Sequence, residues 1–595
     1  MPQRRKLPFS GKKKKEQILV KRQVKGSHKL LRCQNESGDD GDTTEDTEVT
    51  VRKLMEQPVN RDSGPGGSAA ARNKNVNRYN LQFYQESKKE LEQIKLEGYK
   101  PFESLTPKQR EVDASYFEKY DFPVRPKWSY EMHKQTLDRN ETRYFREYVD
   151  RIQKFHKENN TALSLFELNL ETWRQLWRVL ELSEILLIIV DVRFATLMFP
   201  PSLYDYIVNT LKKHAILVLN KVDLVAPEAV LAWKHYFQNT YAGLPVVLFS
   251  SYHPKMLKGT ARARVAHKRS MEGIYNIYRE CHKIVQSEVE LSSWEQKILE
   301  DMHDENFTLA DGAEGGVEES EQISAKADLA AKRASAESLH PREQPSQKMF
   351  RDGILTVGCV GFPNVGKSTL INALKGRKVV SVSRTPGHTK HFQTIFLTNK
   401  VRLCDCPGLV FPSSTPKYLQ VLLGSFPISQ LQVPYRSLKF MAQHLNLPQL
   451  LKLHLPEDHD DWSAAGIADA WALKRGFITA KAARPDKYRA ANHLLRMCLA
   501  GQQQLVLQFY PPGFSNEREK WQQHSEIEEI KRYQNTDTEE KENINDDTSS
   551  VNSESDDSDG ATSSYDETNA DEAEENDHEL TPPKYRNAFA LLEDE

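Results

Sequence analysis

The apolar positions between residues 170 and 250 follow first a helical and then an extended pattern. Leucine and tryptophan recur at spacings of three and four residues over 170–180, which predicts a helix with one apolar face. Continuous apolar runs rich in branched residues follow at 185–190, 215–219 and 246–249. Runs without alternation are typical of strands covered on both faces, so we expect a parallel sheet with crossover helices.

The same pattern returns later in the chain. Apolar runs at 355–360, 394–397 and 401–404 predict three further strands, and a helix is expected soon after the first of them. Neither block alone has enough strands for a nucleotide-binding domain. We therefore expect both blocks to contribute to one α/β sheet.

Charged residues are sorted to the two ends of the chain. Its 82 lysines and arginines nearly balance 84 aspartates and glutamates, yet residues 4–32 carry twelve basic residues and a single acid, Glu16. Residues 537–580 carry eighteen acidic residues and a single base, Lys541. Segments of this composition cannot bury enough apolar surface to fold, so both ends are predicted to be disordered.

Cysteine usage and hydropathy predict a soluble protein inside the cell. The six cysteines show no framework of paired spacings, which is typical of free thiols in a reducing compartment. Cys404 and Cys406 flank Asp405 but lack the further ligands that a metal site needs. The chain starts with charge rather than the apolar core of a signal peptide, and no stretch reaches the ~18 apolar residues of a membrane span.

The most specific motif is a phosphate-binding loop after the strand expected at 355–360. It reads Gly361, Phe362, Pro363, Asn364, Val365, Gly366, Lys367, Ser368, and Thr369 continues it into the expected helix. This is G-x-x-x-x-G-K-[ST] in the context that the motif needs, between a strand and a helix. The glycines let backbone N–H groups face the phosphates, Lys367 neutralises the β and γ oxygens, and the Ser368 hydroxyl binds Mg²⁺.

The choice of base is read from the residues after the second expected strand, which are Asn220, Lys221, Val222 and Asp223. The Asp223 carboxylate can accept from both the N1–H and the N2 amino group of guanine, whereas adenine presents an acceptor at N1. Asn220 can bond the base or brace the phosphate-binding loop, and the stem of Lys221 can cover the ring face. Ser250 and Ser251 follow the third expected strand, where a backbone N–H can meet guanine O6.

A second phosphate motif, D-x-x-G, follows the last expected strand and comprises Asp405, Cys406, Pro407 and Gly408. Asp405 is expected in the Mg²⁺ shell, and the Gly408 N–H is expected to sense the γ-phosphate. The stretch between the two phosphate motifs is loop-like, and in it Thr389 or Thr385 can close on Mg²⁺. We favour Thr389, so the expected magnesium ligands are Ser368, Thr389 and Asp405.

The order of these motifs is unusual, because the base motif at 220–223 precedes the phosphate-binding loop at 361–368. This permuted order, with Asp191-Val192-Arg193 near the first strand and the loop sequence G-F-P-N-V-G-K-S, resembles the circularly permuted GTPases of the YlqF/YawG family. Many members read Asp-Ala-Arg at 191–193, a difference that leaves both charges in place. The resemblance covers about 165 to 515, and phrases such as 232–237 and 379–388 are closest to one branch of the family.

The resemblance and the charge pattern together imply a division of the chain. We expect a basic disordered arm at 1–75, a helical lead-in at 76–169, a circularly permuted P-loop GTPase domain at 170–425 with an acidic insert at about 296–348, a helical domain at 430–515 and an acidic disordered tail at 516–595.

The family resemblance also implies partners. It implies binding of GTP and GDP and a role in ribosome assembly or RNA-linked switching, with ribosomal RNA or pre-ribosomal particles as partners and no membrane. Basic and aromatic residues interleave over 471–496, which suits a phosphate backbone, although an ordinary solvated helix surface is the alternative. The basic arm is interpreted as a nuclear or nucleolar address, an RNA contact or a solubilising tail, so the expected location is nucleus, nucleolus or cytoplasm.

The residues after Gly408 separate two classes of function. Small GTPases place a water-orienting glutamine close behind this glycine, whereas Leu409, Val410 and Phe411 follow here. Hydrolysis of GTP to GDP and phosphate is therefore expected to be slow unless an ion, another loop or a partner helps. The alternative is a GTP-dependent scaffold with negligible turnover.

The catalytic candidates are Asn364, Thr389 and Gly408. P-loop GTPases that resemble this pattern can hold K⁺ near the nucleotide with an asparagine at the place of Asn364, which would put positive charge between the β and γ phosphates. The alternative is that Asn364 only caps or braces the loop through hydrogen bonds.

Overall fold

The computed structural model describes the chain in several stretches. These are residues 88–159, 162–250, 261–303, 349–350, 353–383, 387, 389, 391–457, 459–479, 484–502 and 505–534. The basic arm, most of the acidic insert, most of the acidic tail, Ser251 and Thr385 lie outside the described residues.

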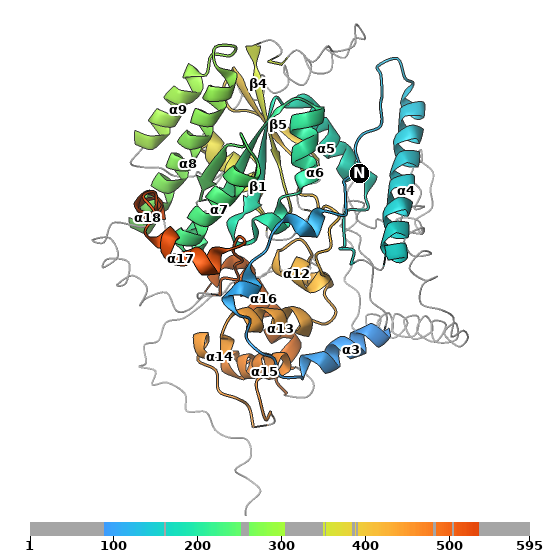
Figure 1. Cartoon of the computed structure of the whole chain (residues 1–595), viewed down its shortest axis with the longest axis vertical. Coiled ribbons are helices and arrows are strands. Elements are labelled where there is room, and N and C mark those ends of the chain that lie inside the picture. The colour runs from blue at the N-terminus through green and yellow to red at the C-terminus, as the bar shows by residue number, and fades with distance from the viewer. Residues whose placement is uncertain are drawn as a thin grey trace, which may run out of the picture. The chain divides into compact units, whose positions relative to one another are not determined.

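One sheet of six strands lies at the centre of the described part (Figure 1). Its strands are β1 (Ile185–Asp191), β2 (His214–Asn220), β3 (Val246–Phe249), β4 (Leu355–Val360), β5 (Gln393–Phe396) and β6 (Val401–Asp405), in the spatial order β3-β2-β1-β4-β6-β5. Strand β1 pairs in parallel with β2 on one side and with β4 on the other. The two sequence blocks therefore build a single sheet, as predicted.

The edge strand β5 differs from the other five. It runs antiparallel to β6, and its side chains are mostly exposed, whereas β1 and β4 are buried at every position. The connection from β5 to β6 is a tight turn in which Leu397 N donates to Val401 O at 2.9 Å. Such a turn leaves no room for a crossover helix, so the pair has to be antiparallel.

Helices cover the sheet and continue beyond it. They are α3 (Lys88–Gly98), α4 (Lys134–Asn159), α5 (Leu170–Leu182), α6 (Pro201–Asp205), α7 (Pro227–Thr240), α8 (Ala261–Val285), α9 (Ser292–His303), α11 (Lys367–Lys375), α12 (Lys417–Leu422), α13 (Tyr435–His444), α14 (Leu447–Leu450), α15 (Ala464–Arg475), α16 (Lys487–Ala500), α17 (Phe514–Gln522) and α18 (Ile527–Gln534). In Figure 1, α7 and α8 lie on one side of the sheet and α5 and α6 on the other. No helix of the described residues has both the length and the apolar character needed to cross a membrane.

Helix α5 shows how the local sequence sets an element. The Asn169 side chain accepts a hydrogen bond from Glu171 N and caps the first turn. Trp173, Leu176 and Trp177 are buried, and the helix packs against β4. The predicted apolar face of 170–180 is therefore the face that covers the sheet.

The structure corrects the expected start of the disordered tail and places a helix across the expected start of the insert. The tail expected from 516 starts with α17 and α18, which form because Ile527 and Ile530 are buried and the two helices pack against α7. The insert expected from about 296 starts inside α9, because Trp294 and Ile298 are buried there.

The helical region after the sheet packs together with part of the lead-in. Helices α13 and α16 contact each other and also contact both α12 and α15, and α3 packs against α13. The chain then returns towards the sheet, where Phe509 N donates to Arg193 O at 2.9 Å. The end of β1 is thereby tied to the segment that follows the helical region.

Candidate nucleotide-binding site

The nucleotide-binding motifs lie close together because the strands that precede them are parallel. The strands β1, β2, β3, β4 and β6 run in the same direction, so their carboxyl ends meet at one edge of the sheet. Asp191 and Asn220 end β1 and β2, Ser250 and Gly361 follow β3 and β4, and Asp405 ends β6. This edge is where open α/β sheets bind ligands.

The phosphate-binding loop joins β4 to α11 through residues with positive φ. Gly361 has φ +151°, and a Cβ there would lie 2.4 Å from Ile189 O, so only glycine fits. Gly366 caps α11 with φ +101°, and Asn364 has φ +59°. Asparagine tolerates this left-handed conformation better than most residues. The N–H groups at the start of α11 are thus presented next to a tightly wound loop.

Lys367 is buried inside this loop. Its Nζ donates to Gly361 O at 3.0 Å and to Phe362 O at 2.6 Å. Burial lowers its pKa, while the nearby Asp405 carboxylate opposes that change. A buried ammonium held by neutral carbonyls is suited to an anionic partner such as a phosphate.

Ser368, Thr389 and Asp405 come together beside Lys367. Ser368 Oγ donates to Asp405 Oδ2 at 3.3 Å and lies 3.5 Å from Thr389 Oγ1. Asp405 Oδ1 is buried and has no hydrogen-bond partner among the described residues. Burial raises the pKa of Asp405 to about 6, against the effects of Lys367 and Ser368. A group of oxygen atoms with one orphaned carboxylate oxygen fits Mg²⁺.

The base motif is braced against the phosphate-binding loop. Asn220 Nδ2 donates to Val365 O at 2.6 Å, so this amide braces the loop, one of the two roles considered from the sequence. Lys221, in a left-handed conformation with φ +63°, donates from Nζ to Asn364 O at 2.8 Å. Asp223 is exposed, and its Oδ1 accepts from Ser250 Oγ at 2.7 Å. Ser250 therefore orients the carboxylate expected to recognise guanine.

The D-x-x-G motif closes over the phosphate-binding loop. A Cβ on Gly408 would lie 2.7 Å from Pro363 Cα and 3.1 Å from Lys367 Nζ. Leu409, Val410 and Phe411 are buried in the core. These three apolar side chains carry no group that could hydrogen-bond a water molecule.

Three contacts at the site were missed by sequence reasoning. Arg193 donates from Nη1 to Cys498 O at 3.1 Å, near the end of α16. Asn364 Nδ2 donates to Gly424 O at 2.8 Å, just after α12. Gln534 Nε2, at the end of α18, donates to Val222 O at 2.6 Å. The first two had a sequence signal, the charged pair at 191–193 and the bracing role considered for Asn364, but the sequence did not indicate the partner of either residue.

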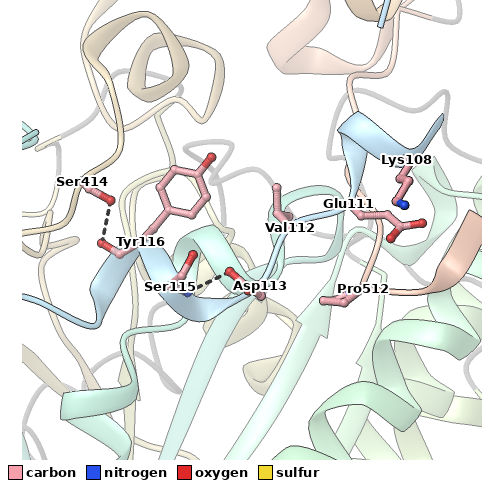
Figure 2. A pocket seen from close by; sticks show the side chains of 8 residues that line it. All are labelled: Lys108, Glu111, Val112, Asp113, Ser115, Tyr116, Ser414 and Pro512. Atoms are coloured by element: carbon pink, nitrogen blue, oxygen red, sulfur yellow. Dashed lines mark hydrogen bonds between the residues drawn. The ribbon is translucent and has the colours of Figure 1, made fainter. Parts of the chain in front are cut away.

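The cavity in Figure 2 is separate from the motifs. It has a volume of about 530 Å³ and is lined by Lys108, Glu111, Val112, Asp113, Ser115, Tyr116, Ser414 and Pro512, none of which belongs to a nucleotide motif. Ser115 N donates to Asp113, and Ser414 Oγ donates to Tyr116 O at 3.2 Å, as the dashed lines show. Glu111 accepts from Gly513 N and Ser515 N at 2.8 Å each, so this cavity is a packing seam between distant segments.

The phosphate-binding loop, the D-x-x-G motif and a base motif that comes first in the chain define a circularly permuted P-loop GTPase. Residues 356–427 match the family model described as 50S ribosome-binding GTPase. The chain is 43% identical over 559 residues to guanine nucleotide-binding protein-like 1 of Mus musculus, with 88% of each chain covered. It belongs to the guanine nucleotide-binding protein-like 1 family, which confirms the branch indicated by 232–237 and 379–388.

Two further comparisons are more distant. The large subunit GTPase 1 homolog of Rattus norvegicus is 31% identical over 444 residues, which cover 66% of this chain and 67% of that protein. The crystal structure of GNP-bound YlqF from T. maritima is 18% identical and covers 57% of this chain and 98% of that chain, with a TM-score of 0.31.

Proposed function

We propose that the chain binds Mg²⁺ with GTP or GDP at this edge of the sheet and hydrolyses GTP slowly, as a switch linked to ribosome assembly or RNA. The observation that carries the proposal is the orphaned Asp405 Oδ1, which is buried beside Ser368, Thr389 and the Lys367 ammonium. A buried carboxylate oxygen without a partner is costly unless a cation satisfies it. Mg²⁺, when bound, supplies positive charge to the phosphate oxygens.

Each residue then has a distinct task. Lys367 neutralises the β and γ phosphates, and the backbone N–H groups from Gly361 to Thr369 surround them. Asp405, Ser368 and Thr389 are the proposed metal ligands. The Gly408 N–H is assigned to sensing the γ-phosphate, and the close packing of this residue against Pro363 of the phosphate-binding loop supports that assignment.

Guanine selection is assigned to the opposite end of the site. Asp223 accepts from the two guanine donors, and Ser250 holds it in place through the 2.7 Å hydrogen bond. The Lys221 stem covers the ring while its Nζ stays bound to Asp191 and Asn364. The backbone N–H of Ser251 is proposed to meet guanine O6.

Slow turnover follows from burial after the D-x-x-G motif. No side chain among Leu409, Val410 and Phe411 can orient water, because all three are in the core. Catalysis then needs another source of help in place of the absent water-orienting side chain. We propose two candidates, a K⁺ ion held by Asn364 and a partner macromolecule. A GTP-dependent scaffold with negligible turnover is the second candidate, favoured by the direct hydrogen bonds from Arg193 and Asn364 to the helical region.

The link to RNA or ribosomes rests on relatives and on one surface. Two matched descriptions contain the words large subunit GTPase and 50S ribosome-binding GTPase. On the helical region, Arg475 lies 4.7 Å over the Trp471 ring and Arg489 lies 4.6 Å over Phe477. The Trp471 ring is itself buried, so this surface suits a nucleic-acid backbone through its arginine charges beside the exposed Ile478 rather than through stacking of bases on Trp471. The proposed location is the nucleus, nucleolus or cytoplasm.

Two experiments test the proposal. Single-turnover hydrolysis of labelled GTP by the full chain, with and without Mg²⁺, is expected to show slow, Mg²⁺-dependent release of phosphate. Crosslinking of a GTP-locked chain in cells is expected to recover ribosomal RNA or pre-ribosomal proteins. Absence of any GTP binding would reject the proposal outright. GTP binding without phosphate release would reject the GTPase switch and support the GTP-dependent scaffold instead.

A further inference from the structure

A cluster of metal-ligating side chains lies away from the nucleotide motifs. His235 on α7 meets His524 and Glu526, which stand in the turn between α17 and α18. One ligand atom from each lies within 4.8 Å of the others, and no other such group occurs among the residues that the structure describes. We propose that these three residues bind a divalent transition-metal ion of the Zn²⁺ type.

The spacing of the ligand atoms suits such an ion. Tetrahedral bonds of about 2.0–2.2 Å place neighbouring ligand atoms roughly 3.3 Å apart. His235 Nε2 and Glu526 Oε1 are already 3.5 Å apart. The third atom needs to approach by no more than about 1.5 Å through a side-chain rotation. Ligation by His524 would replace the hydrogen bond that its Nδ1 accepts from Glu526 N at 3.2 Å. Two imidazoles and one carboxylate with an open fourth position for water are a common donor set for zinc.

His235 supplies an independent sign of a missing partner. Its Nε2 is buried and has no hydrogen-bond partner among the described residues. Glu526 Oε1 lies 3.5 Å from this nitrogen, which is longer than a normal hydrogen bond. A metal ion would satisfy this nitrogen.

The neighbours of the cluster fix its geometry. Lys234 Nζ donates to Glu526 Oε2 at 2.6 Å, which leaves Oε1 on the side of His235. The Trp521 ring lies 5.4 Å from the His235 ring and 6.0 Å from the His524 ring, so both imidazoles pack against it. The Lys234 charge orients the carboxylate but opposes a cation. Removal of the Lys234 charge is therefore expected to strengthen metal binding. If the cluster held no metal, the same change would only remove the ion pair with Glu526 and weaken the contact between α7 and α18.

The site has a structural consequence for the base motif. Helix α18 ends at Gln534, whose Nε2 donates to Val222 O at 2.6 Å and to Val225 O at 2.9 Å. A metal that joins α7 to the turn before α18 stabilises this contact with the guanine-binding loop. The consequence for nucleotide affinity rests on the proposed function, but metal binding itself does not.

The test uses the full chain after removal of metals with a chelator. Co²⁺ is titrated and followed by visible absorption, and Zn²⁺ is measured by competition, all without nucleotide. The wild type is expected to bind one ion with nitrogen and oxygen ligands, and His235→Ala, His524→Ala and Glu526→Gln are expected to weaken it by about 100-fold or more. Lys234→Met is expected to tighten binding, and His454→Ala, at an exposed histidine, is expected to leave it unchanged.

Glu526→Gln preserves the side-chain volume and is therefore expected to fold. It provides the decisive comparison with the wild type if either histidine variant fails to fold. Equal Co²⁺ spectra and Zn²⁺ affinities in the wild type and in Glu526→Gln would overturn the proposal. Weaker rather than tighter binding in Lys234→Met would also count against it. Failure to bind GTP in the presence of a saturated zinc site would instead reject the proposed function and leave the metal site standing.

Discussion

Asp191 and Arg193 form a bidentate ion pair that is buried at the end of β1, with Nε to Oδ1 at 3.0 Å and Nη2 to Oδ2 at 2.8 Å. Lys221 Nζ donates to the same Asp191 Oδ2 at 2.8 Å. Burial alone would raise the pKa of Asp191, but the charges of Arg193 and Lys221 hold it well below its usual range. Since Arg193 also donates to Cys498 O, one buried network joins the base motif to the helical region.

Arg193→Ala is expected to destabilise the chain by about 3–5 kcal/mol, because it leaves the Asp191 charge buried with a single partner. Urea unfolding measures the loss. Arg436→Ala, which removes an ion pair with Glu97 at 3.5 Å from a half-exposed arginine, is the control and is expected to lose less than about 1 kcal/mol. Equal losses in the two variants would show that the buried network adds no stability.

Asp223→Asn is expected to weaken GDP binding by about 100-fold or more and to move the preference to xanthine nucleotides. The amide donates where the carboxylate could only accept, so it matches the O2 of xanthine and not the N2 amino group of guanine. Competition titrations with GDP, the xanthosine analogue and ADP measure the preference. Asp150→Asn, at an exposed position on α4, should behave like the parent. Equal ATP and GTP affinity in the wild type would contradict the assignment of the base motif.

Lys367→Ala and Ser368→Asn are each expected to lower the affinity for Mg²⁺ with GTP by about 100-fold or more, since each removes a charge-assisted contact. Fluorescent nucleotide binding with and without Mg²⁺ is the measurement. Lys378→Ala removes an exposed lysine just beyond α11 and serves as the control. Parent-like binding by either variant would mean that the nucleotide lies elsewhere.

The sequence predicted the elements and motifs because each signal is local. A continuous apolar run indicates a buried strand, and a glycine-rich loop with lysine and serine indicates phosphate binding, whatever surrounds them. The antiparallel direction of β5 was not predicted, since it depends on the short turn from Leu397 to Val401. The contacts of Arg193 with Cys498 and of Gln534 with Val222 join residues about three hundred positions apart, and only tertiary packing determines them.

Burial of Glu167 is expected to make the free energy of unfolding fall as the pH rises. This side chain is fully buried just before α5, and burial raises its pKa from 4.5 to about 7, although backbone N–H groups of Asn169 and Leu168 oppose that change. The folded state thus keeps a proton that the unfolded state releases, so stability is expected to fall as pH rises from about 4.5 to about 7.

Glu167→Gln keeps an oxygen that can accept from Asn169 N and removes the titration. It is expected to be more stable than the wild type at pH 8 by up to about 3 kcal/mol and nearly equal to it at pH 4.5. Urea unfolding at the two pH values gives the difference. A constant difference between the two proteins across this range would mean that Glu167 stays ionised in the folded state.

Asn364 is the residue on which the rate of hydrolysis is expected to depend. Its amide nitrogen donates to Gly424 O at 2.8 Å, so a K⁺ ion would take the amide oxygen. An ion there would place positive charge where the phosphates develop negative charge, and replacement of Na⁺ by K⁺ at constant ionic strength is expected to raise the single-turnover rate by about 10-fold or more. Quenched-flow or manual sampling of labelled phosphate measures this rate.

The positive φ of Asn364 requires a careful choice of variant. Asn364→Ala would combine loss of the amide with strain at φ +59°, whereas Asn364→Gly removes the amide and adopts this conformation freely. If K⁺ binds at Asn364, both variants lose the difference between the two salts, and Asn364→Gly keeps nearly parental GDP affinity. If Asn364 only braces the loop through Gly424, the wild type shows the same rate in K⁺ and Na⁺, and both variants change the two rates equally. That second result would leave a partner protein or RNA as the source of the missing catalytic group, because Leu409, Val410 and Phe411 stay buried in the core.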